Sequence, residues 1–439
     1  MSGTADREIR VDPATMQTAA GLPDIKCMNE TFVFDISEKK VLRELAARVA
    51  EIAADPVQEE RVELWTKHND LQTSQPVVFI DPENGWNECI PAATLACTAP
   101  MARAWEMFLR KQIYWFEQFQ DDKVIEPYFD VPYSFSDTGW GVVLRKEGGE
   151  NGGAYRVKQA VASYEEDFSQ VHFPKIVIDE QESVQVLELA HELFDGTLVV
   201  RRKSSWWWTL GLTWSYINLR GFEDFLMDLI DEPEWVHRLM NLLCDGTLDM
   251  LDFLQEGGYL PQNTGGTYVG SGGFGFTRQL PARDAGMVTT RDMWGFVESQ
   301  ETSSVSPSMY AEFILPYHKK IMERFGLTCY GCCEAYDPRW KYVRELPRLR
   351  RVSVSPWASL DTISENLGKD YVASIKLNPA PLAQTVMNED VVRHDIITAL
   401  RASDGCIPEF VMKDNNTLGG NPHNAVRWVQ MMREEIDRM

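Results

Sequence analysis

Three side chains that could bind a metal close two apolar segments in the middle of the chain. Glu298 ends the segment WGFVE, and Cys332 and Cys333 end the segment TCYGCC. If both segments are strands of one parallel sheet, their carboxyl ends lie at the edge where α/β proteins build their sites. A carboxylate and two thiolates there would be ligands for zinc or another borderline metal. The alternative is that both cysteines are small buried apolar residues, as free cysteines commonly are.

Three charged residues follow other apolar segments in a similar way. Lys376 lies in SIKLNP, and Lys413 and Asp414 lie in FVMKDNNT. A lysine that leaves an apolar run is costly to bury unless it is paired. We therefore expect either a site mouth, where Lys376 orients substrate and Lys413 or Asp414 takes part in catalysis, or ion pairs between neighbouring strands.

Aromatic residues are concentrated after the segment TLVVRRK. Trp206, Trp207 and Trp208 are consecutive, and Trp214 follows them. Aromatic walls at the mouth of a site suit a flat apolar substrate. On this interpretation Trp208, Trp214 and Tyr330 contact substrate, whereas packing in the core or between subunits explains the tryptophans equally well.

Gly270, Gly272 and Gly275 match the pattern GxGxxG, but no apolar-periodic helix follows them. The context of a dinucleotide-binding turn is therefore missing, and we expect a flexible loop. The chain also has neither a GxSxG nor a GxxxxGK[ST] motif.

Strand-like and helical segments alternate along most of the chain. Ser306 and Pro307 are suited to begin a helix over about 308–325, which Gly326 ends. Alternation of this kind indicates a parallel sheet, and eight strands indicate an α/β fold of the (β/α)8 TIM-barrel type. The eight expected strands are Pro76–Pro82, Thr197–Lys203, Tyr259–Gln262, Trp294–Glu298, Thr328–Cys332, Arg351–Pro356, Val372–Leu377 and Glu409–Lys413.

Residues 1–175 are expected to form an N-terminal helical and irregular extension that includes the first barrel strand, and residues 176–439 the main part of the barrel. Within the extension we expect a helix from Ser37 and another over about 100–121. Residues 122–175 read as an irregular, aromatic-rich flap with GGENGG at an exposed tip. We expect this flap to cover the barrel mouth or to pair between subunits.

The composition limits the partners of the chain. Its 439 residues are 44% apolar and 25% charged, and the net charge is −23. This charge argues against nucleic acid and anionic lipid as partners. The sequence has no apolar run of membrane-spanning length and no signal-peptide pattern, and its eight cysteines do not form a disulfide framework. We therefore expect a cytoplasmic enzyme that can form a homo-oligomer.

Three stretches of the chain resemble the uroporphyrinogen decarboxylase superfamily. WGFVESQETSSVSPSMYAEFILPYHKKIMERFG is similar to its strand, turn and helix, and TCYGCCE occupies the place of a His-x-Cys-Gly strand end. The stretch KDNNTLGGNPHNAVRWVQMMRE is similar to its last strand, loop and helix. The resemblance covers roughly residues 180–439 and is closest to the zinc-dependent methyltransferases that work with a corrinoid protein.

The chain departs from that superfamily in two places. The Arg-Gln-Ala-Gly-Arg run that grips porphyrin carboxylates in the decarboxylase is absent, and Tyr330 stands where the metal histidine of the branch would be. Some aryl-ether demethylating members use two glutamates and a histidine, and Glu298, Glu312 and Cys333 fall at nearly that spacing. Glu334 is a further candidate ligand.

The resemblance implies methyl transfer from a small methylated donor to the cobalt of cobalamin carried by a separate corrinoid protein. The aromatic mouth favours an aryl methyl ether as donor. Zinc held by Glu298, Cys332 and Cys333 would act as a Lewis acid on the ether oxygen. Lys413 or Asp414 would hold a ring substituent or supply a proton, and the corrinoid protein would dock over the mouth.

Two other classes of function are open. One is a metal-independent decarboxylase or lyase that uses Lys376, Lys413 and Asp414. The other is a non-catalytic barrel that only binds an aromatic ligand.

Overall fold

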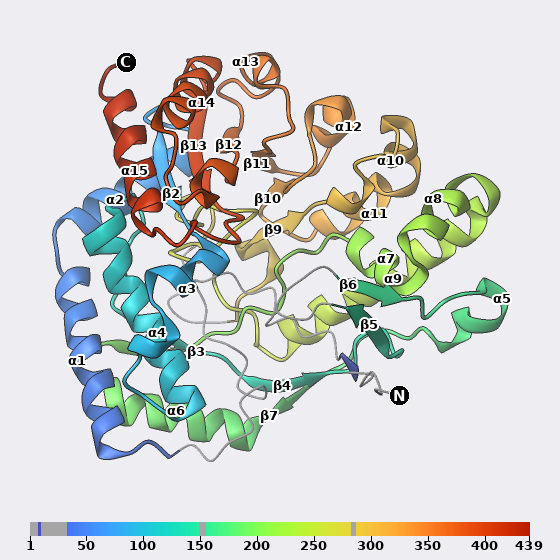
Figure 1. The fold of residues 1–439 in the computed structure, drawn as a ribbon. Helices are drawn as coiled ribbons and strands as arrows, with labels where there is room; N and C mark the ends of the chain where they lie inside the picture. Colours follow the sequence, from blue (N-terminus) through green and yellow to red (C-terminus); the bar gives the residue numbers. More distant parts are fainter. Residues whose placement is uncertain (1–7, 10–32, 149–154, 282–286) are drawn as a thin grey trace, which may run out of the picture.

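A parallel sheet of six strands forms the centre of the computed structural model, which describes residues 8–9, 33–148, 155–281 and 287–439. The strand order is β2-β13-β12-β11-β10-β9 (Figure 1). Almost every residue of these strands is buried, as expected for a parallel sheet that is covered on both faces. The strands are β2 (Val77–Ile80), β9 (Trp294–Val297), β10 (Leu327–Tyr330), β11 (Leu349–Val354), β12 (Val372–Lys376) and β13 (Ile407–Met412).

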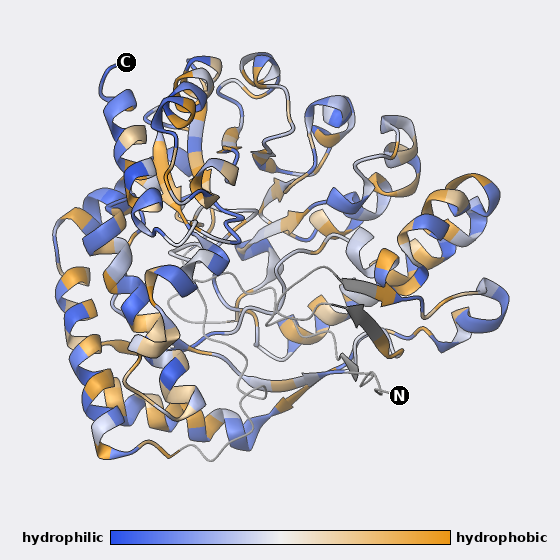
Figure 2. Cartoon of the chain, viewed as in Figure 1, coloured by the Kyte–Doolittle hydropathy of each residue, from blue (hydrophilic) through white to orange (hydrophobic). Residues whose placement is uncertain are grey.

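Helices alternate with the strands of the second half and lie on the outside of the sheet (Figure 1). Their apolar faces turn toward the strands (Figure 2). The helix expected over 308–325 is divided at Ile314, where Pro316 follows and the backbone departs from helical geometry. These helices are α10 (Pro307–Phe313), α11 (Leu315–Met322), α12 (Trp340–Val343), α13 (Ile363–Asn366), α14 (Glu389–Ala402) and α15 (His423–Ile436).

The first half of the chain supplies a second group of helices. The first of them begins with a capping box, in which Asp35 and Glu38 each accept a hydrogen bond from the other's backbone N–H. A π-helical turn, Trp115–Phe119, continues the fourth. The group comprises α1 (Ile36–Ala53), α2 (Val57–Asn69), α3 (Trp86–Cys89), α4 (Pro100–Tyr114) and α6 (Glu180–Phe194), and α7 (Thr213–Arg220), α8 (Phe222–Asp231) and α9 (Pro233–Glu256) follow. No described helix is both long and apolar enough to cross a membrane.

Residues 122–175 contain more regular structure than the sequence predicted. Strand β3 (Tyr128–Val131) pairs in parallel with β8 (Val199–Arg202), and β4 (Ser134–Asp137) pairs antiparallel with β7 (Ile176–Asp179). The prediction that this segment is irregular was wrong, because these strands find partners that lie far away in sequence, whereas its covering of the barrel mouth stays a prediction. The remaining elements are β1 (Glu8–Ile9), β5 (Leu144–Gly148), β6 (Tyr155–Lys158) and α5 (Tyr164–Asp167), and most of the expected GGENGG tip lies outside the described residues.

Single hydrogen bonds continue the central sheet at both edges. Asp122 N–H donates to the Val78 carbonyl at 2.8 Å, and Leu210 N–H donates to the Phe296 carbonyl at 2.9 Å. The α/β class is confirmed, and seven of the eight expected strands are present; Tyr259–Gln262 is not one of them. Closure into an eight-stranded barrel stays a prediction.

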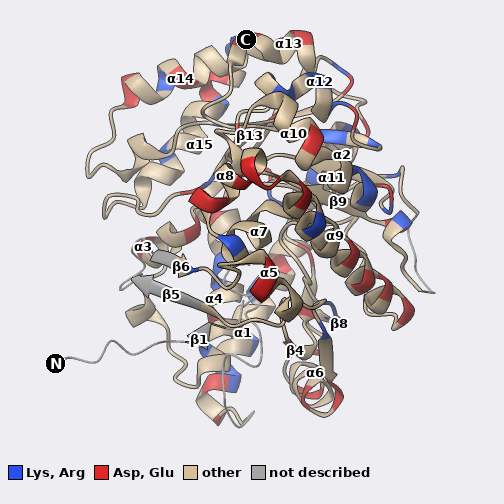
Figure 3. Cartoon of the chain, turned by 90° about the vertical axis from the view of Figure 1, so that its right-hand side faces the viewer, with Lys and Arg blue, Asp and Glu red and all other residues tan. Residues whose placement is uncertain are grey.

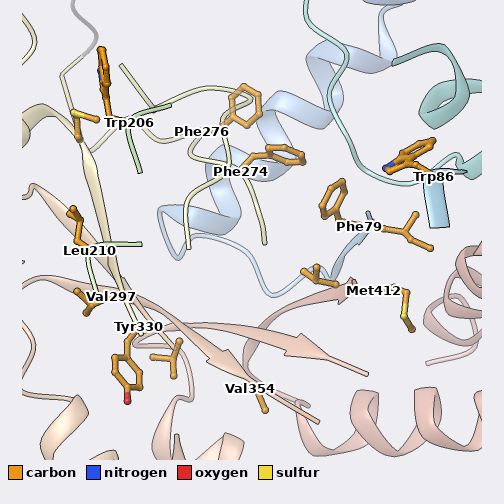
Figure 4. Close-up of a cluster of buried hydrophobic side chains, with 14 of the residues drawn as sticks. Phe79, Trp86, Trp206, Leu210, Phe274, Phe276, Val297, Tyr330, Val354 and Met412 are labelled. Atoms are coloured by element: carbon orange, nitrogen blue, oxygen red, sulfur yellow. The ribbon is translucent and has the colours of Figure 1, made fainter. Parts of the chain in front are cut away.

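A buried hairpin, residues 263–276, packs against the central sheet at β13. Val269 N–H donates to the Gly273 carbonyl, and Tyr268 is bridged to Phe274. The Phe274 ring packs edge-on against Phe79 at 4.9 Å (Figure 4). The expected flexible loop is therefore a fixed part of the core. We call this segment the glycine hairpin.

Glycine is required in this hairpin by space and by backbone conformation. Gly272 and Gly273 have φ values of +112° and +88°, which other residues rarely adopt. A Cβ on Gly273 would lie 2.7 Å from a carboxylate oxygen of Glu409, and one on Gly272 would lie 2.8 Å from Val411. The glycines that match GxGxxG are thus explained by the close packing of the hairpin backbone against the sheet, and not by a dinucleotide-binding turn.

Candidate functional site

The carboxyl ends of β2 and β13 and the tip of the glycine hairpin enclose a narrow cleft. Its free volume is about 10 Å³, roughly the space of one water molecule. Such a location, outside the carboxyl ends of parallel strands, is where α/β proteins place their sites. The cleft is lined by Asp81, Glu83, Trp208, Tyr268, Gly270, Ser271, Gly272, Val411 and Lys413.

Glu83 is an acid of this cleft whose pKa lies near neutrality. Burial raises its pKa from 4.5 to about 7, and the charge of Lys413 opposes that rise. The Lys413 ammonium nitrogen lies 3.4 Å from the Glu83 carboxylate. An acid with this pKa is populated both as a proton donor and as a proton acceptor near pH 7.

Lys413 is almost fully buried between acidic and thiol groups. Its ammonium nitrogen lies 3.3 Å from the carboxylate of Asp414, which has a φ of +61°. Burial alone would lower the pKa of Lys413, but the neighbouring Cys332, Glu83 and Asp414 raise it above its ordinary value. Lys413 is therefore a fixed positive charge in the cleft, and its ion pairs with Glu83 and Asp414 leave its part in catalysis a prediction.

Tyr268 and Asp81 form a buried polar pair in the wall of the cleft. The Tyr268 hydroxyl donates to Asp81 at 2.8 Å, and the indole N–H of Trp86 donates to the other oxygen of the carboxylate at 2.9 Å. Burial and the charge of Asp81 raise the pKa of Tyr268 well above its ordinary value. The phenol therefore stays protonated and fixes the hairpin to the end of β2.

A chain of polar contacts leads out of the cleft through the two cysteines. The Ser271 hydroxyl donates to the Cys332 sulfur at 3.1 Å, and that sulfur lies 3.6 Å from the sulfur of Cys333. The contact with Cys333, together with burial, raises the pKa of Cys332 well above its ordinary value, and the same contact lowers the pKa of Cys333. The exposed Cys333 is the more readily ionised of the two.

Cys333 also lines a second, larger cavity of about 350 Å³. This cavity lies among the loops that follow β9, β10 and β11. Its lining residues are Ser303, Ser304, Val305, Ser306, Pro307, Cys333, Ala335, Pro338, Arg339 and Trp357.

The ends of β9 and β10 are neighbours, as the sequence predicted. Tyr330 is paired with Val297, so that Glu298 and Gly331 follow side by side. Glu334 joins the two ends, because its carboxylate accepts hydrogen bonds from the backbone N–H groups of Ser299 and Cys332 at 2.8 and 2.9 Å.

Glu298 is fully buried beside other acids. One carboxylate oxygen accepts the Gln300 N–H at 2.9 Å, and the other, which faces Gly211, has no hydrogen-bond partner among the described residues. Burial and the nearby charges of Glu301 and Glu334 raise the pKa of Glu298 well above its ordinary value. Glu298 is therefore held in the protonated, neutral form.

The expected zinc ligands do not converge in the described structure. Across residues 8–9, 33–148, 155–281 and 287–439, no three His, Cys, Asp or Glu side chains are arranged to hold a metal ion. Glu298 faces Gly211, Cys332 faces Ser271, and Cys333 opens toward the larger cavity. The thiol and carboxylate chemistry suits zinc, but the arrangement does not fit it, so no catalytic step is derived through a metal.

The remaining expected site residues lie in different surroundings. Lys376 donates to the hydroxyl of Ser374 at 2.8 Å, and burial lowers its pKa to about 8. Tyr330 is buried between the sheet and α10, with its ring 6.3 Å from that of Tyr310 (Figure 4). It therefore does not line either cavity.

The four tryptophans are separated by the fold. Trp206 is buried against Phe135, whereas Trp208 lies on Phe296 and lines the cleft. Trp214 is the second residue of α7 and is half-buried, away from the lining of both cavities. Of the expected aromatic wall, only Trp208 is in place.

Sequence reasoning missed Asp81, Glu83, Tyr268 and Ser271. Asp81 follows the apolar segment VVFI directly and Glu83 comes two residues later, so the rule that identified Glu298 would also have identified them. No comparable signal marks Tyr268 and Ser271, because the hairpin that carries them reaches the cleft only through tertiary packing.

Comparison with known proteins gives a similarity of fold. No family model and no curated protein sequence matches the chain. Fourteen chains of solved structures match. One is a methyltransferase from Methanosarcina mazei, with a TM-score of 0.50 and 11% sequence identity over 84% of this chain and 97% of that chain. At this identity the likeness shows the fold alone.

Proposed function

We propose that this chain is a methyltransferase that moves a methyl group from a small methylated donor to the cobalt of cobalamin on a separate corrinoid protein. The observation that carries the proposal is Glu83, an acid with a pKa of about 7 that is held against Lys413 at the carboxyl edge of the sheet. The fold likeness to a methyltransferase and the resemblance of residues 180–439 support the same class. An aryl methyl ether is the donor that we infer.

The chemical difficulty is the leaving group. When the bond from the methyl carbon to oxygen breaks, its electron pair stays on oxygen, and an unprotonated phenoxide leaves poorly. The carboxyl group of Glu83 donates a proton to that oxygen, and the methyl carbon is bound by the nucleophile that the partner presents. General acid catalysis of this kind contributes about 10²- to 10⁴-fold to the rate.

The neighbours of Glu83 position the reacting oxygen. The Lys413 ammonium, held by Asp414, stabilises the Glu83 carboxylate that forms as the proton leaves. Trp208 and Tyr268 provide aromatic surface in the same cleft. Because the free volume is that of about one water molecule, only the methoxy end of a donor enters it.

Zinc binding is a separate part of the proposal, with Glu298, Cys332 and Cys333 as the inferred ligands. These side chains do not converge among the described residues, so no step of the reaction above depends on zinc. Elemental analysis of the purified protein is expected to give one zinc per chain, lost on joint replacement of Cys332 and Cys333 with serine. A metal-free, active protein would exclude this part of the proposal.

We further infer that the chain closes into a (β/α)8 barrel, that residues 1–175 form its extension, and that the corrinoid protein docks over the mouth.

The proposed methyl transfer is tested by mixing the protein with a reduced corrinoid protein and 2-methoxyphenol. Methylation of the corrinoid, followed by its visible spectrum, with equimolar release of catechol is the expected result. Release of carbon dioxide from an aromatic acid, without methylation, would favour the lyase instead.

A further inference from the structure

The larger cavity has a distinct chemical character from the narrow cleft beside it. Its volume of about 350 Å³ is within the range of small-molecule sites. Three serines line it, at positions 303, 304 and 306, and apolar surface comes from Val305, Pro307 and Pro338. No acidic side chain is among its described lining residues, and the one charged group is the guanidinium of Arg339.

Arg339 is buried without an ionic partner. It is 3% exposed, and its nitrogens donate to the hydroxyls of Ser299 and Thr302 and to the carbonyls of Thr302 and Val305. No carboxylate among the described residues lies within ion-pair distance of it. The guanidinium carbon also lies 4.7 Å from the centre of the Tyr310 ring, but no described anion pairs with it, so the cavity has a positively charged wall.

One acid near this cavity, Glu334, is already engaged. The charges of Glu334 and Arg339 both act on the pKa of Tyr330. Both carboxylate oxygens of Glu334, however, accept hydrogen bonds from backbone N–H groups at the ends of β9 and β10. Its role is to join those strand ends. An anion that neutralises Arg339 would therefore have to come from a ligand in the cavity.

Trp357 provides an aromatic surface at the rim. It is 78% exposed, which is unusual for the largest apolar side chain, and it lies in the loop after β11. An exposed indole beside a cavity is suited to stack on a planar ring. The Trp357 side of the cavity is thus suited to bind a flat ring, and the Arg339 side is suited to bind a negatively charged group.

We propose that this cavity binds a planar aromatic ring that carries a carboxylate, with the ring on Trp357 and the carboxylate toward Arg339 and the serine hydroxyls. The proposal rests on the proposed function in one respect: it takes this ligand to be the methyl donor, which is then a methoxylated aromatic acid. Cys333 lines the cavity and contacts Cys332, which contacts Ser271 in the cleft. The cysteine pair therefore lies between the two cavities.

Calorimetric titration of the full chain with benzoate and with benzyl alcohol tests the charge preference. The two probes share a ring and differ in charge, and neither carries a methyl group that could be transferred. Benzoate is expected to bind about tenfold more tightly, since hydrogen bonds to a charged group are roughly twice as strong as neutral ones. Equal affinities, or tighter binding of benzyl alcohol, would overturn the proposal.

Variants locate the site. Trp357→Ala is expected to weaken benzoate binding about five- to tenfold, the size of an aromatic pair interaction. Ser304→Ala, a surface change, is expected to weaken it less, and Phe222→Ala, an exposed aromatic that lines neither cavity, is the matched control. Benzoate binding that is unaffected by Trp357→Ala would contradict the assigned place.

The outcomes for the cavity and for the function are independent. If benzoate binds as expected but the corrinoid is methylated neither from 2-methoxyphenol nor from 3-methoxybenzoate, the anion site stands and the methyltransferase proposal falls. If methylation occurs while benzoate binding is absent or insensitive to Trp357→Ala, the function stands and the assigned donor class falls.

Discussion

The two acids that contact Lys413 hold backbone conformations that residues other than glycine rarely adopt. Glu83 and Asp414 have φ values of +50° and +61°, and they lie on either side of Lys413. Residues held in such conformations cost about 1–3 kcal/mol each and persist where the surrounding structure fixes them. Here the fixed geometry keeps two carboxylates within 3.4 Å of one buried ammonium.

Replacement of Glu83 with glutamine is expected to lower kcat by about 10²- to 10⁴-fold, because the amide cannot donate a proton. In the unchanged enzyme, kcat/KM is expected to fall as the pH rises through about 7, since only the protonated carboxyl group is active and its pKa is about 7. The pH profile of methyl transfer measures both effects. Glu59→Gln, an exposed change on α2, is the control.

If Glu83→Gln keeps some activity but its kcat/KM no longer falls as the pH rises through about 7, this carboxyl group is the acid. An unchanged rate and an unchanged profile would show instead that the proton comes from elsewhere.

Glu409 is the residue whose ionisation most directly supports the core. Burial would raise its pKa, but Arg351 and His68 lower it to about 2, and the Arg351 guanidinium lies 3.0 Å away. A folded-state pKa below the unfolded value of 4.5 gives stability that is present above pH 4.5 and is lost as the pH falls toward 2. The size of this loss is about 3 kcal/mol.

Urea unfolding between pH 5 and pH 2 tests this expectation. The unchanged protein should lose about 3 kcal/mol more over this interval than Glu409→Gln, which no longer titrates. Glu44→Gln, which removes a surface ion pair with Lys40, should follow the unchanged protein. Parallel curves for all three proteins would mean that Glu409 is not ionised in the fold.

At the scale of elements, the glycine hairpin connects the core to the cleft. Arg351 donates to the carbonyls of Val269 and Phe274, and to Glu409 on β13. The tip of the same hairpin supplies Ser271 to Cys332. A change that displaces the hairpin therefore acts on both stability and the site.

Gly273→Ala and Gly196→Ala form a matched pair that separates packing from backbone strain. Both glycines have positive φ, +88° and +82°, but only at Gly273 would a Cβ meet atoms, at 2.7 Å from Glu409. Gly196→Ala should cost about 1 kcal/mol for its conformation alone. Gly273→Ala should cost about 2–4 kcal/mol, because overpacking against a buried ion pair is added.

The measurement is the free energy of unfolding in urea for both variants. Equal costs would show that the carboxylate of Glu409 can move aside and that the hairpin is not fixed by it.

At the scale of the molecule, the surface is strongly acidic. The net charge is −23, and Asp245, Asp249, Asp252 and Glu256 follow one another at helical spacing along α9 (Figure 3). Basic residues pair with some of these acids, as Lys320 does with Asp245. A field of this sign repels nucleic acid and attracts a protein partner with a basic face.

Association with the corrinoid partner is therefore expected to weaken as salt is added. Between 50 and 300 mM salt, screening shortens the reach of surface charges, so a basic docking face should lose affinity. Calorimetry at the two concentrations measures this, with the titration of the same protein with uncharged benzyl alcohol as the control for general salt effects. Tighter association at high salt would indicate an apolar or acidic docking face.

The sequence by itself determined the elements of the second half of the chain. Apolar runs predicted β9 to β13, and the pairing of Val297 with Tyr330 confirms that Glu298 and the cysteines follow neighbouring strands. The N-cap at Ser306 is also confirmed, since its hydroxyl accepts the Met309 N–H. These features depend on residues that are close in sequence, and local patterns record them.

Only the tertiary structure decided which side chains face the cleft. Glu83, Tyr268 and Ser271 come from segments far apart in sequence, and the glycine hairpin reaches the sheet because its backbone, without side chains, packs against Val411 and Glu409. Tertiary packing also places Tyr330 beside Tyr310 of α10 and Arg339 among the hydroxyls of Ser299 and Thr302. Side-chain direction and pairing are set by long-range contacts, which leave no pattern in the neighbouring residues.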